Sequence, residues 1–453
     1  MFRSLLCCKR LLTSASRCTH GGLGLPNVRN IKPMPSAVLS LGRPLDDCKS
    51  FQAMVHTHAP KLAAKTIKVI DAGKKMEITW NNGETSRFHA VWLRHHCRCV
   101  ECYCPSSNQR SLHFDELPLE VLILKATLSD SATVQIQWND NSHIGEFTPA
   151  FLQKYCYSQS SLEKKKNSLK TSLYTKPCVP SVMWQDLEEE SYVHKWLSDI
   201  NEHGLSLVKG APNTIDLMLE CIPRHVAPLV NSTYGKIYNA IVEEANPINL
   251  SCSRKKLQYH MDMVYYESTP GIQFLHCIRF DESLVGGETV FVDMFAICEE
   301  FRRTNPLEFE ILCSFPTAFE VSSDTPVNLL IMRPVINLNR EKEIIGVYWS
   351  PMASSELQIA EEDVLDYCRA KQLFARAISN FHIQNIVRLR PGDIIAFNNR
   401  RMAHARNELS GSGERHLQGC YVNSCEYKSR LITLARKYGD ASSIKRVGNM
   451  DWM

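Results

Sequence analysis

The chain has 453 residues, of which 44% are hydrophobic and 22% are charged, and its formal net charge is only +4. Such a composition is ordinary for a globular protein, and a chain of this length exceeds one ordinary core, so we expect two domains. The slight charge gives no reason to expect nucleic acid as a partner, and the sequence contains no run of about twenty apolar residues that would predict a membrane span.

The first 45 residues differ from the rest of the chain. They contain no Asp or Glu, and Arg and Lys are scattered among Ser, Leu and Cys. Leu and Phe residues are spaced to form one helical face, which favours a mitochondrial presequence over residues 1–45. The alternative is a basic tail without structure on a cytoplasmic protein.

Residues 66–157 form the predicted N-terminal domain. Alternating apolar and polar residues predict strands at 67–80 and 134–138, and Asn81-Asn82-Gly83 predicts a hairpin turn. A polar link over residues 158–180 contains Lys164-Lys165-Lys166 and is interpreted as an exposed connection. The catalytic domain is expected over 181–436, followed by a C-terminal tail over 437–453. Its predicted helices span residues 188–201, 214–221, 295–303 and 360–379.

A cysteine cluster lies within the predicted N-terminal domain. The chain has eighteen dispersed cysteines, a pattern that argues against a disulfide framework. Cys97, Cys99 and Cys102 offer three closely spaced thiolates, and three sulfurs with one imidazole suit a structural zinc ion. His95, His96, His113 and Cys104 all lie nearby, so spacing alone does not select the fourth ligand. Ordinary buried cysteines are the alternative.

The most specific pattern of the chain is His260-Met261-Asp262, followed by His404 and then Arg415. Side chains alternate along a strand, so His-x-Asp places two ligands on one side of an extended strand or its end. Two imidazoles and a carboxylate can bind one face of Fe(II) and leave the other positions open.

Short strands are predicted around these residues. An apolar run follows Pro270-Gly271, another strand follows Gly286-Gly287, and Pro391-Gly392-Asp393 precedes a buried strand at 394–397. We expect that last strand to deliver His404 just past its end. Arg415 would return on the next strand, where its guanidinium could pair with a carboxylate of a dicarboxylic co-substrate.

These motifs resemble the Fe(II)- and 2-oxoglutarate-dependent oxygenases of the taurine dioxygenase type, and within them the carnitine-biosynthesis branch. The resemblance runs from about Val91 to Arg436 and includes the stretches at Val91–Arg94, Cys97–Tyr103, Gly271–Cys277 and Arg415–Tyr421. It implies a mainly β fold with flanking helices, in which a double-stranded β-helix (jelly-roll) catalytic domain follows a small zinc-stapled N-terminal β domain.

The resemblance also implies the cofactors and the reaction. His260, Asp262 and His404 would bind Fe(2+), Arg415 and Thr289 would hold 2-oxoglutarate, and His143 would be the fourth zinc ligand. Ascorbate would restore oxidised iron. With O2, the enzyme would hydroxylate a small substrate that carries a quaternary ammonium group and would release succinate and CO2. The branch acts on γ-butyrobetaine, giving L-carnitine, or on trimethyllysine, and a homodimer is left open.

The substrate residues implied by the resemblance are Tyr234, Tyr238, Asn249 and Tyr421. A trimethylammonium group has no N–H to donate, so a site must bind it through aromatic faces. Three departures bear on the substrate: Cys252 replaces a further cage tyrosine, Asn398 replaces an Asp, and Arg400 replaces a Trp. A ligand-binding module without catalysis and a zinc hydrolase are the competing classes.

Overall fold

The computed structural model describes residues 63–445, except 130–132, 141–142, 171–172, 174–176, 178, 243–249 and 323–326. The predicted presequence, Asn249 and the end of the predicted C-terminal tail lie outside the described residues. None of the helices in the described parts of the chain combines the length and the apolar character that crossing a bilayer requires.

The N-terminal part contains two antiparallel three-stranded sheets, ordered β1-β2-β3 and β6-β7-β8. Their bounds are β1 Ala64–Ile70, β2 Lys75–Trp80, β3 Thr85–His89, β6 Ile123–Leu128, β7 Val134–Trp138 and β8 Ile144–Phe147. Trp80 and Trp138 are almost fully buried in a core formed by residues 64–156. This part also contains α1 Ala90–His95, α2 Pro149–Lys154 and the short hairpin of β4 Tyr103–Cys104 and β5 Gln109–Arg110.

One prediction for this region needs correction, and the predicted link contains a helix that was not predicted. The strand predicted over 67–80 is two strands, because a tight turn at Asp71–Gly73, with positive φ at Asp71 and Ala72, reverses the chain. The polar link contains a helix, α3 Gln159–Leu169, in which no residue is buried. The Ser158 hydroxyl accepts a hydrogen bond from the Ser161 N–H and caps this helix, a signal that the prediction overlooked.

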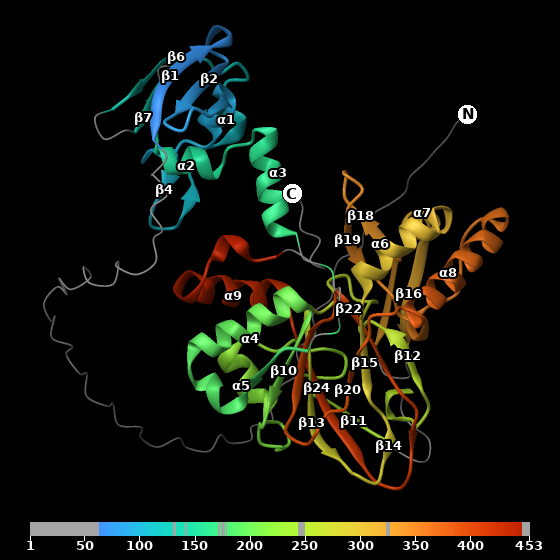
Figure 1. The fold of residues 1–453 in the computed structure, drawn as a ribbon. Coiled ribbons are helices and arrows are strands. Elements are labelled where there is room, and N and C mark those ends of the chain that lie inside the picture. Colours follow the sequence, from blue (N-terminus) through green and yellow to red (C-terminus); the bar gives the residue numbers. More distant parts are fainter. Residues whose placement is uncertain are drawn as a thin grey trace, which may run out of the picture. The chain divides into compact units, whose positions relative to one another are not determined.

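The part of the chain from residue 181 onward contains two larger sheets (Figure 1). The six-stranded sheet has the order β11-β24-β13-β21-β10-β9, and the four-stranded sheet has the order β12-β22-β15-β20. The strands of the first sheet are β9 Ser181–Met183, β10 Leu205–Lys209, β11 Tyr238–Ile241, β13 Ile272–Phe280, β21 Ile394–Asn398 and β24 Arg415–Val422. Those of the second are β12 Leu257–His260, β15 Thr289–Asp293, β20 Asn385–Val387 and β22 Met402–Arg406.

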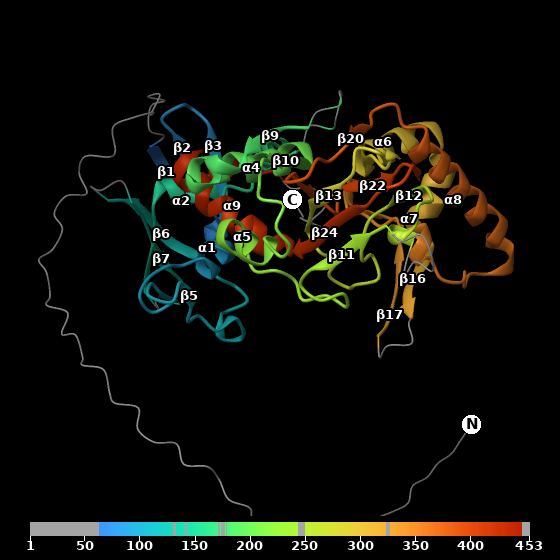
Figure 2. The same ribbon diagram turned by 90° about the horizontal axis from the view of Figure 1, so that it is seen from below.

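Helices flank both sheets (Figures 1 and 2). Helices α4 Glu190–His203, α5 Met218–His225 and α9 Ser424–Tyr438 share a core with the outer face of the larger sheet. Helices α6 Met294–Thr304, α7 Pro306–Ser314 and α8 Val364–Ser379 form another core next to the smaller sheet. A third core joins the facing sides of the two sheets, with Leu275 from one and Phe291 from the other. This is the predicted mainly β fold with flanking helices.

Three short hairpins complete this part. They are β14 Val285–Gly286 with β23 Leu409–Ser410, β16 Pro316–Ser322 with β17 Asn328–Pro334, and β18 Ile336–Leu338 with β19 Ile344–Val347.

Predicted element bounds hold to within a few residues, with two exceptions. The helix predicted over 214–221 is Met218–His225, which begins and ends four residues later and continues past Pro223. His404 lies within strand β22 and not just past the end of β21, since the chain makes a turn after Asn398 and forms a further strand.

Candidate active site

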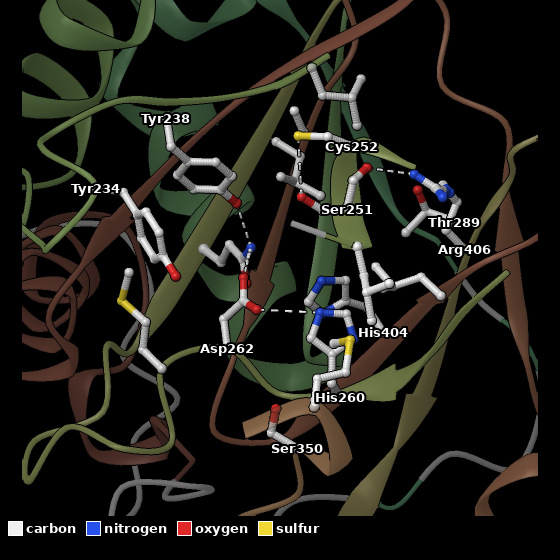
Figure 3. A pocket seen from close by; sticks show the side chains of 18 of the residues that line it. Tyr234, Tyr238, Ser251, Cys252, His260, Asp262, Thr289, Ser350, His404 and Arg406 are labelled. Atoms are coloured by element: carbon white, nitrogen blue, oxygen red, sulfur yellow. Dashed lines mark hydrogen bonds and ion pairs between the residues drawn. The ribbon is translucent and has the colours of Figure 1, made fainter. Parts of the chain in front are cut away.

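Two histidines and an aspartate meet at the end of strand β12. His260 is the last residue of β12 and pairs directly with His404 on the neighbouring strand β22, so the two ring centroids lie 4.1 Å apart. Asp262 follows two residues later, and its Oδ1 lies 3.3 Å from His260 Nε2 (Figure 3). One potential ligand atom from each residue lies within 4.8 Å of the others. The structure thus brings the three predicted metal ligands together.

The protonation of these groups suits a metal. Burial, together with the neighbouring His260, lowers the pKa of His404 to about 3, so its imidazole is neutral at physiological pH. Burial opposes ionisation of Asp262, but hydrogen bonds from His260 and Tyr421 and electrostatic interaction with the two imidazoles outweigh burial and hold the pKa of Asp262 well below the usual value. Two imidazoles and one carboxylate form the donor set that non-haem Fe(II) prefers, and the residues therefore fit iron.

A cavity of about 620 Å³ surrounds the three residues and is lined from both sheets. Strand β24 supplies Arg415, Leu417 and Tyr421 to the cavity, residues at a spacing of two or four that share one face of the strand. Strand β13 likewise supplies Gln273 and Leu275.

One side of the cavity carries a buried positive charge. Arg415 is 4% exposed, and its guanidinium carbon lies 5.5 Å from the centre of the Phe280 ring. Burial and the nearby Arg406 lower the pKa of Arg415 to about 10. Among the described residues, no carboxylate forms an ion pair with Arg415. Thr289, at the start of β15, lines the same cavity, so both residues predicted to hold the co-substrate are present there.

Aromatic residues line another part of the cavity. The rings of Tyr238 and Tyr421 stack with centroids 5.5 Å apart, and Tyr234 lies 6.4 Å from Tyr238. Tyr238 pairs across the sheet with Gly419, where a Cβ atom would lie 2.0 Å from the tyrosine Cζ. Only glycine therefore leaves room for this ring. Three of the four predicted substrate residues line the cavity, and the fourth, Asn249, lies outside the described residues.

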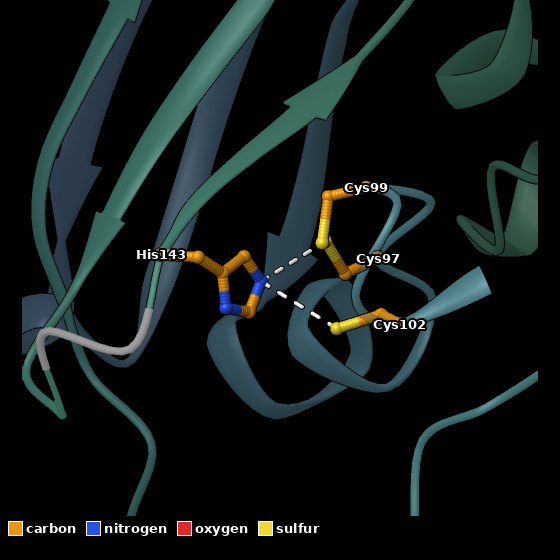
Figure 4. A group of neighbouring side chains, drawn as sticks. All are labelled: Cys97, Cys99, Cys102 and His143. Atoms are coloured by element: carbon orange, nitrogen blue, oxygen red, sulfur yellow. Dashed lines mark hydrogen bonds between the residues drawn. The ribbon is translucent and has the colours of Figure 1, made fainter.

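The cysteine cluster of the N-terminal part is also assembled. Cys97 Sγ lies 3.2 Å and Cys102 Sγ lies 3.7 Å from His143 Nε2, and a ligand atom of Cys99 completes the group within 4.8 Å (Figure 4). A tetrahedral zinc site has S···N edges of about 3.5 Å. Burial raises the pKa of the Cys97 thiol to about 12, so a bound cation is needed to keep it ionised. The four residues fit zinc, and the structure places His143 in the group instead of the histidines and the cysteine that lie closer to Cys97–Cys102 in sequence.

The comparisons with known proteins identify the family. The family model of the taurine catabolism dioxygenase TauD, TfdA family matches residues 176–421, more than half of the 453-residue chain. The chain belongs to this family. A second model, gamma-butyrobetaine hydroxylase-like, N-terminal, matches residues 67–153, which contain the whole cysteine and histidine cluster of this oxygenase.

Two relatives extend over most of the oxygenase. A gamma-butyrobetaine dioxygenase from Pseudomonas sp. (strain AK-1) is 26% identical over 372 residues, which are 80% of this chain and 94% of the relative. A trimethyllysine dioxygenase, mitochondrial, from Homo sapiens is 25% identical over 387 residues, 81% of this chain and 89% of the relative. A solved taurine dioxygenase from Burkholderia xenovorans has 14% identity and a TM-score of 0.40, covering 55% of this chain and 90% of its own.

Family membership confirms the predicted class of enzyme. The protein is a 2-oxoglutarate-dependent dioxygenase of the butyrobetaine and trimethyllysine hydroxylase type, and the family implies Fe(2+) and 2-oxoglutarate. The predicted jelly-roll fold is confirmed as well.

The cavity is also lined by residues that were not predicted, among them Arg406, Gln273 and Tyr265. Arg406 lies two positions after His404, so the alternation of a strand would have placed it on the same face. Gln273 is a fully buried polar residue in an otherwise apolar stretch of β13. Tyr265 lines the cavity, and its hydroxyl lies 3.5 Å from that of Tyr234. Gln273 carried a signal in its polarity, whereas Tyr265 carried none beyond its proximity to Asp262.

Proposed function

We propose that this oxygenase hydroxylates γ-butyrobetaine to L-carnitine, with 2-oxoglutarate converted to succinate and CO2. The observation that carries the proposal is that one cavity holds three kinds of group. These are the two histidines with the aspartate, an arginine that has no carboxylate partner among the described residues, and stacked tyrosines. Family relatives of the γ-butyrobetaine dioxygenase type support the choice of substrate.

His260, Asp262 and His404 would hold Fe(2+), and the iron with O2 would supply the chemistry that breaks the substrate C–H bond. The chain's own residues bind and orient. Arg415 would pair with the distal carboxylate of 2-oxoglutarate, and the Thr289 hydroxyl would donate a hydrogen bond to it. No general base is required from the protein, since the metal and O2 carry out the bond-breaking step.

Tyr234, Tyr238 and Tyr421 would bind the trimethylammonium group. Because this cation has no N–H donor, its attraction to the site comes from aromatic faces, and each is worth about 0.5–2 kcal/mol. The Tyr421 hydroxyl donates to Asp262, so a negative charge also lies close to one of these rings. A bound cation would therefore lie next to the metal position, where its carbon chain can be oxidised.

The test is succinate formation by purified protein with Fe(II), ascorbate and 2-oxoglutarate. Three compounds are compared: γ-butyrobetaine, trimethyllysine, and 5,5-dimethylhexanoate, the isostere of γ-butyrobetaine in which a carbon atom replaces the cationic nitrogen. We expect succinate and L-carnitine with γ-butyrobetaine and much weaker turnover with the isostere, which keeps the shape and the carboxylate but lacks the positive charge. His260→Ala serves as the inactive control.

Each outcome separates the candidates. Turnover only with trimethyllysine would replace the substrate and keep the reaction class. Equal turnover with γ-butyrobetaine and its isostere would contradict cation recognition by the tyrosines. Protein that binds Fe(II) and 2-oxoglutarate but turns over none of the compounds would favour a ligand-binding module.

We also propose a mitochondrial location. The acid-free composition of residues 1–45 and the mitochondrial relatives support it. Sequencing the N-terminus of the protein isolated from fractionated cells tests the proposal, since a processed chain in the mitochondrial fraction is expected. An unprocessed chain in the cytosolic fraction would contradict it.

A further inference from the structure

The two carboxylate oxygens of Asp262 have different surroundings. Oδ1 faces His260 Nε2 at 3.3 Å, on the side where a metal would lie. Oδ2 accepts two hydrogen bonds of 2.7 Å, one from Gln273 Nε2 and one from the Tyr421 hydroxyl. Hydrogen bonds to a carboxylate are among the stronger ones in proteins, so Oδ2 is held away from the metal position.

Gln273 is a polar residue in the buried core, and within the described parts of the chain its side-chain amide bonds only to groups of this site. It is 0% exposed on strand β13, and its Nε2 also donates to the Tyr238 hydroxyl at 2.8 Å. Both amide hydrogens are therefore used, while Oε1 has no hydrogen-bond partner among the described residues. The opposite amide orientation would place Oε1 against the carboxylate of Asp262, and the network thus fixes the side chain in one orientation.

The same contacts reach the aromatic part of the cavity. Tyr421 donates to Asp262 through its hydroxyl, and its ring stacks on that of Tyr238. The hydroxyl of Tyr238 in turn accepts from Gln273. Two rings that face the cavity are therefore tied through their hydroxyls to the carboxylate beside the two histidines.

We propose that Gln273 and Tyr421 are positioning residues that keep Asp262 a ligand through Oδ1 alone. A carboxylate that binds through both oxygens takes up a further metal position, and this chemistry needs positions open for the co-substrate and O2. The network also couples cation binding at the tyrosines to the geometry of the metal site. The inference rests on the proposed function, because it presumes iron at these three residues.

Tyr421→Phe is the test variant, because it keeps the aromatic face and removes only the hydroxyl. The first measurement is Co(II) binding without O2, followed by the visible absorption of Co(II), whose intensity reports coordination number. Loss of an outer hydrogen bond to a metal ligand commonly costs 10- to 100-fold in metal affinity. We expect a loss of about that size, together with a changed Co(II) spectrum.

The second measurement is the ratio of succinate to L-carnitine formed with γ-butyrobetaine. The wild type is expected to form them in equal amounts, and Tyr421→Phe is expected to form several times more succinate than L-carnitine. Gln273→Met removes the other hydrogen bond and should act in the same direction. Since a buried strand residue is changed in that variant, Tyr421→Phe decides the question if Gln273→Met does not fold.

Tyr427→Phe is the matched control. Tyr427 is buried in helix α9 and donates a 2.7 Å hydrogen bond to the Leu197 carbonyl, so the variant loses a buried tyrosine hydroxyl away from the cavity. The proposal is overturned if Tyr421→Phe matches Tyr427→Phe in Co(II) affinity, spectrum and product ratio. A wild type that binds Co(II) at these residues but forms no succinate with any substrate would instead sink the proposed function.

Discussion

Replacing Arg415 by Met separates binding of the co-substrate from stability of the fold. The side chain is 4% exposed, and among the described residues no carboxylate forms an ion pair with it. Burial first, and then the charge of Arg406, lower its pKa from 12.5 to about 10. In the ligand-free protein the charge of this guanidinium therefore lowers the free energy of unfolding.

The size of that cost follows from the shift. Since a pKa unit corresponds to about 1.4 kcal/mol, the buried charge destabilises the ligand-free protein by about 3 kcal/mol. A carboxylate of 2-oxoglutarate would offset the cost on binding, and loss of one partner of such a buried pair costs about 2–5 kcal/mol. This converts to an increase of about thirty-fold to several thousand-fold in the KM for 2-oxoglutarate.

The assay compares two keto acids and two variants. 2-Oxopentanoate has the same chain length as 2-oxoglutarate but lacks the distal carboxylate, so Arg415→Met should raise KM for 2-oxoglutarate only. The control is Arg388→Met, because Arg388 lies 4.2 Å from the same Phe280 ring without lining the cavity. We expect Arg388→Met to leave KM unchanged and Arg415→Met to unfold at higher urea concentration than the wild type without ligand.

Two results would refute this reasoning. A KM for 2-oxoglutarate that stays within about three-fold of the wild type in Arg415→Met would place the anchor of the distal carboxylate elsewhere. An equal rise for both keto acids would show that the substitution disturbs the cavity in general, and the assignment of Arg415 to one carboxylate would fail.

Three further predictions concern other parts of the chain. Cys97→Ala should lose the zinc that elemental analysis finds in the wild type and should unfold the β1–β8 region at lower temperature; a metal-free wild type would contradict this. Gly419→Ala should displace Tyr238 and raise KM for γ-butyrobetaine at least ten-fold while KM for 2-oxoglutarate stays unchanged, and an unchanged KM for the amine would disprove the contact. Burial lowers the pKa of His276 from 6.5 to about 4, so the folded state loses stability as pH falls. Between pH 7 and 5 the free energy of unfolding in urea should fall by about 2 kcal/mol more for the wild type than for His276→Gln. Equal decreases for the two proteins would contradict this prediction.

The sequence predicts those parts of the site that depend on alternation along one strand. Arg415 and Tyr421 follow one another at even spacing on β24, and His260 with Asp262 follows the same rule at the end of β12. The turn glycines and prolines predicted most of the strands around them. The side chains that one strand places on one face can therefore be predicted from the sequence.

Contacts between strands could not be predicted in this way. The pairing of His260 with His404 depends on the register of β12 and β22, which lie more than a hundred residues apart in the sequence. The role of Gln273 depends equally on where Asp262 and Tyr421 lie across the sheet. Local signals were also missed, as at Asp71–Gly73, where a turn was hidden in an alternating run.

The three departures from the carnitine-branch pattern do not bear equally on the substrate. Asn398 Oδ1 accepts a hydrogen bond from the Arg400 backbone N–H, and the Arg400 Nε donates to the Thr269 carbonyl at 2.7 Å. Neither Asn398 nor Arg400 lines the cavity, whereas Cys252 does. Asn398 and Arg400 therefore act on the segment that follows the aspartate ligand.

Asn399 lies between those two residues and contacts the aspartate ligand directly. Its side-chain amide accepts a hydrogen bond from the Asp262 N–H and donates one to the Asp262 carbonyl, both at 2.9 Å, so it fixes the backbone of Asp262. Substitutions at Asn398 and Arg400, which flank Asn399, should therefore change metal affinity more than the KM for the amine. A substitution at Cys252 should change the KM for the amine more than metal affinity. Comparing Cys252→Tyr with Arg400→Trp for Co(II) affinity and for the KM of γ-butyrobetaine tests this distinction. If Arg400→Trp moved only the KM for the amine, the departures would have to be assigned to the substrate after all.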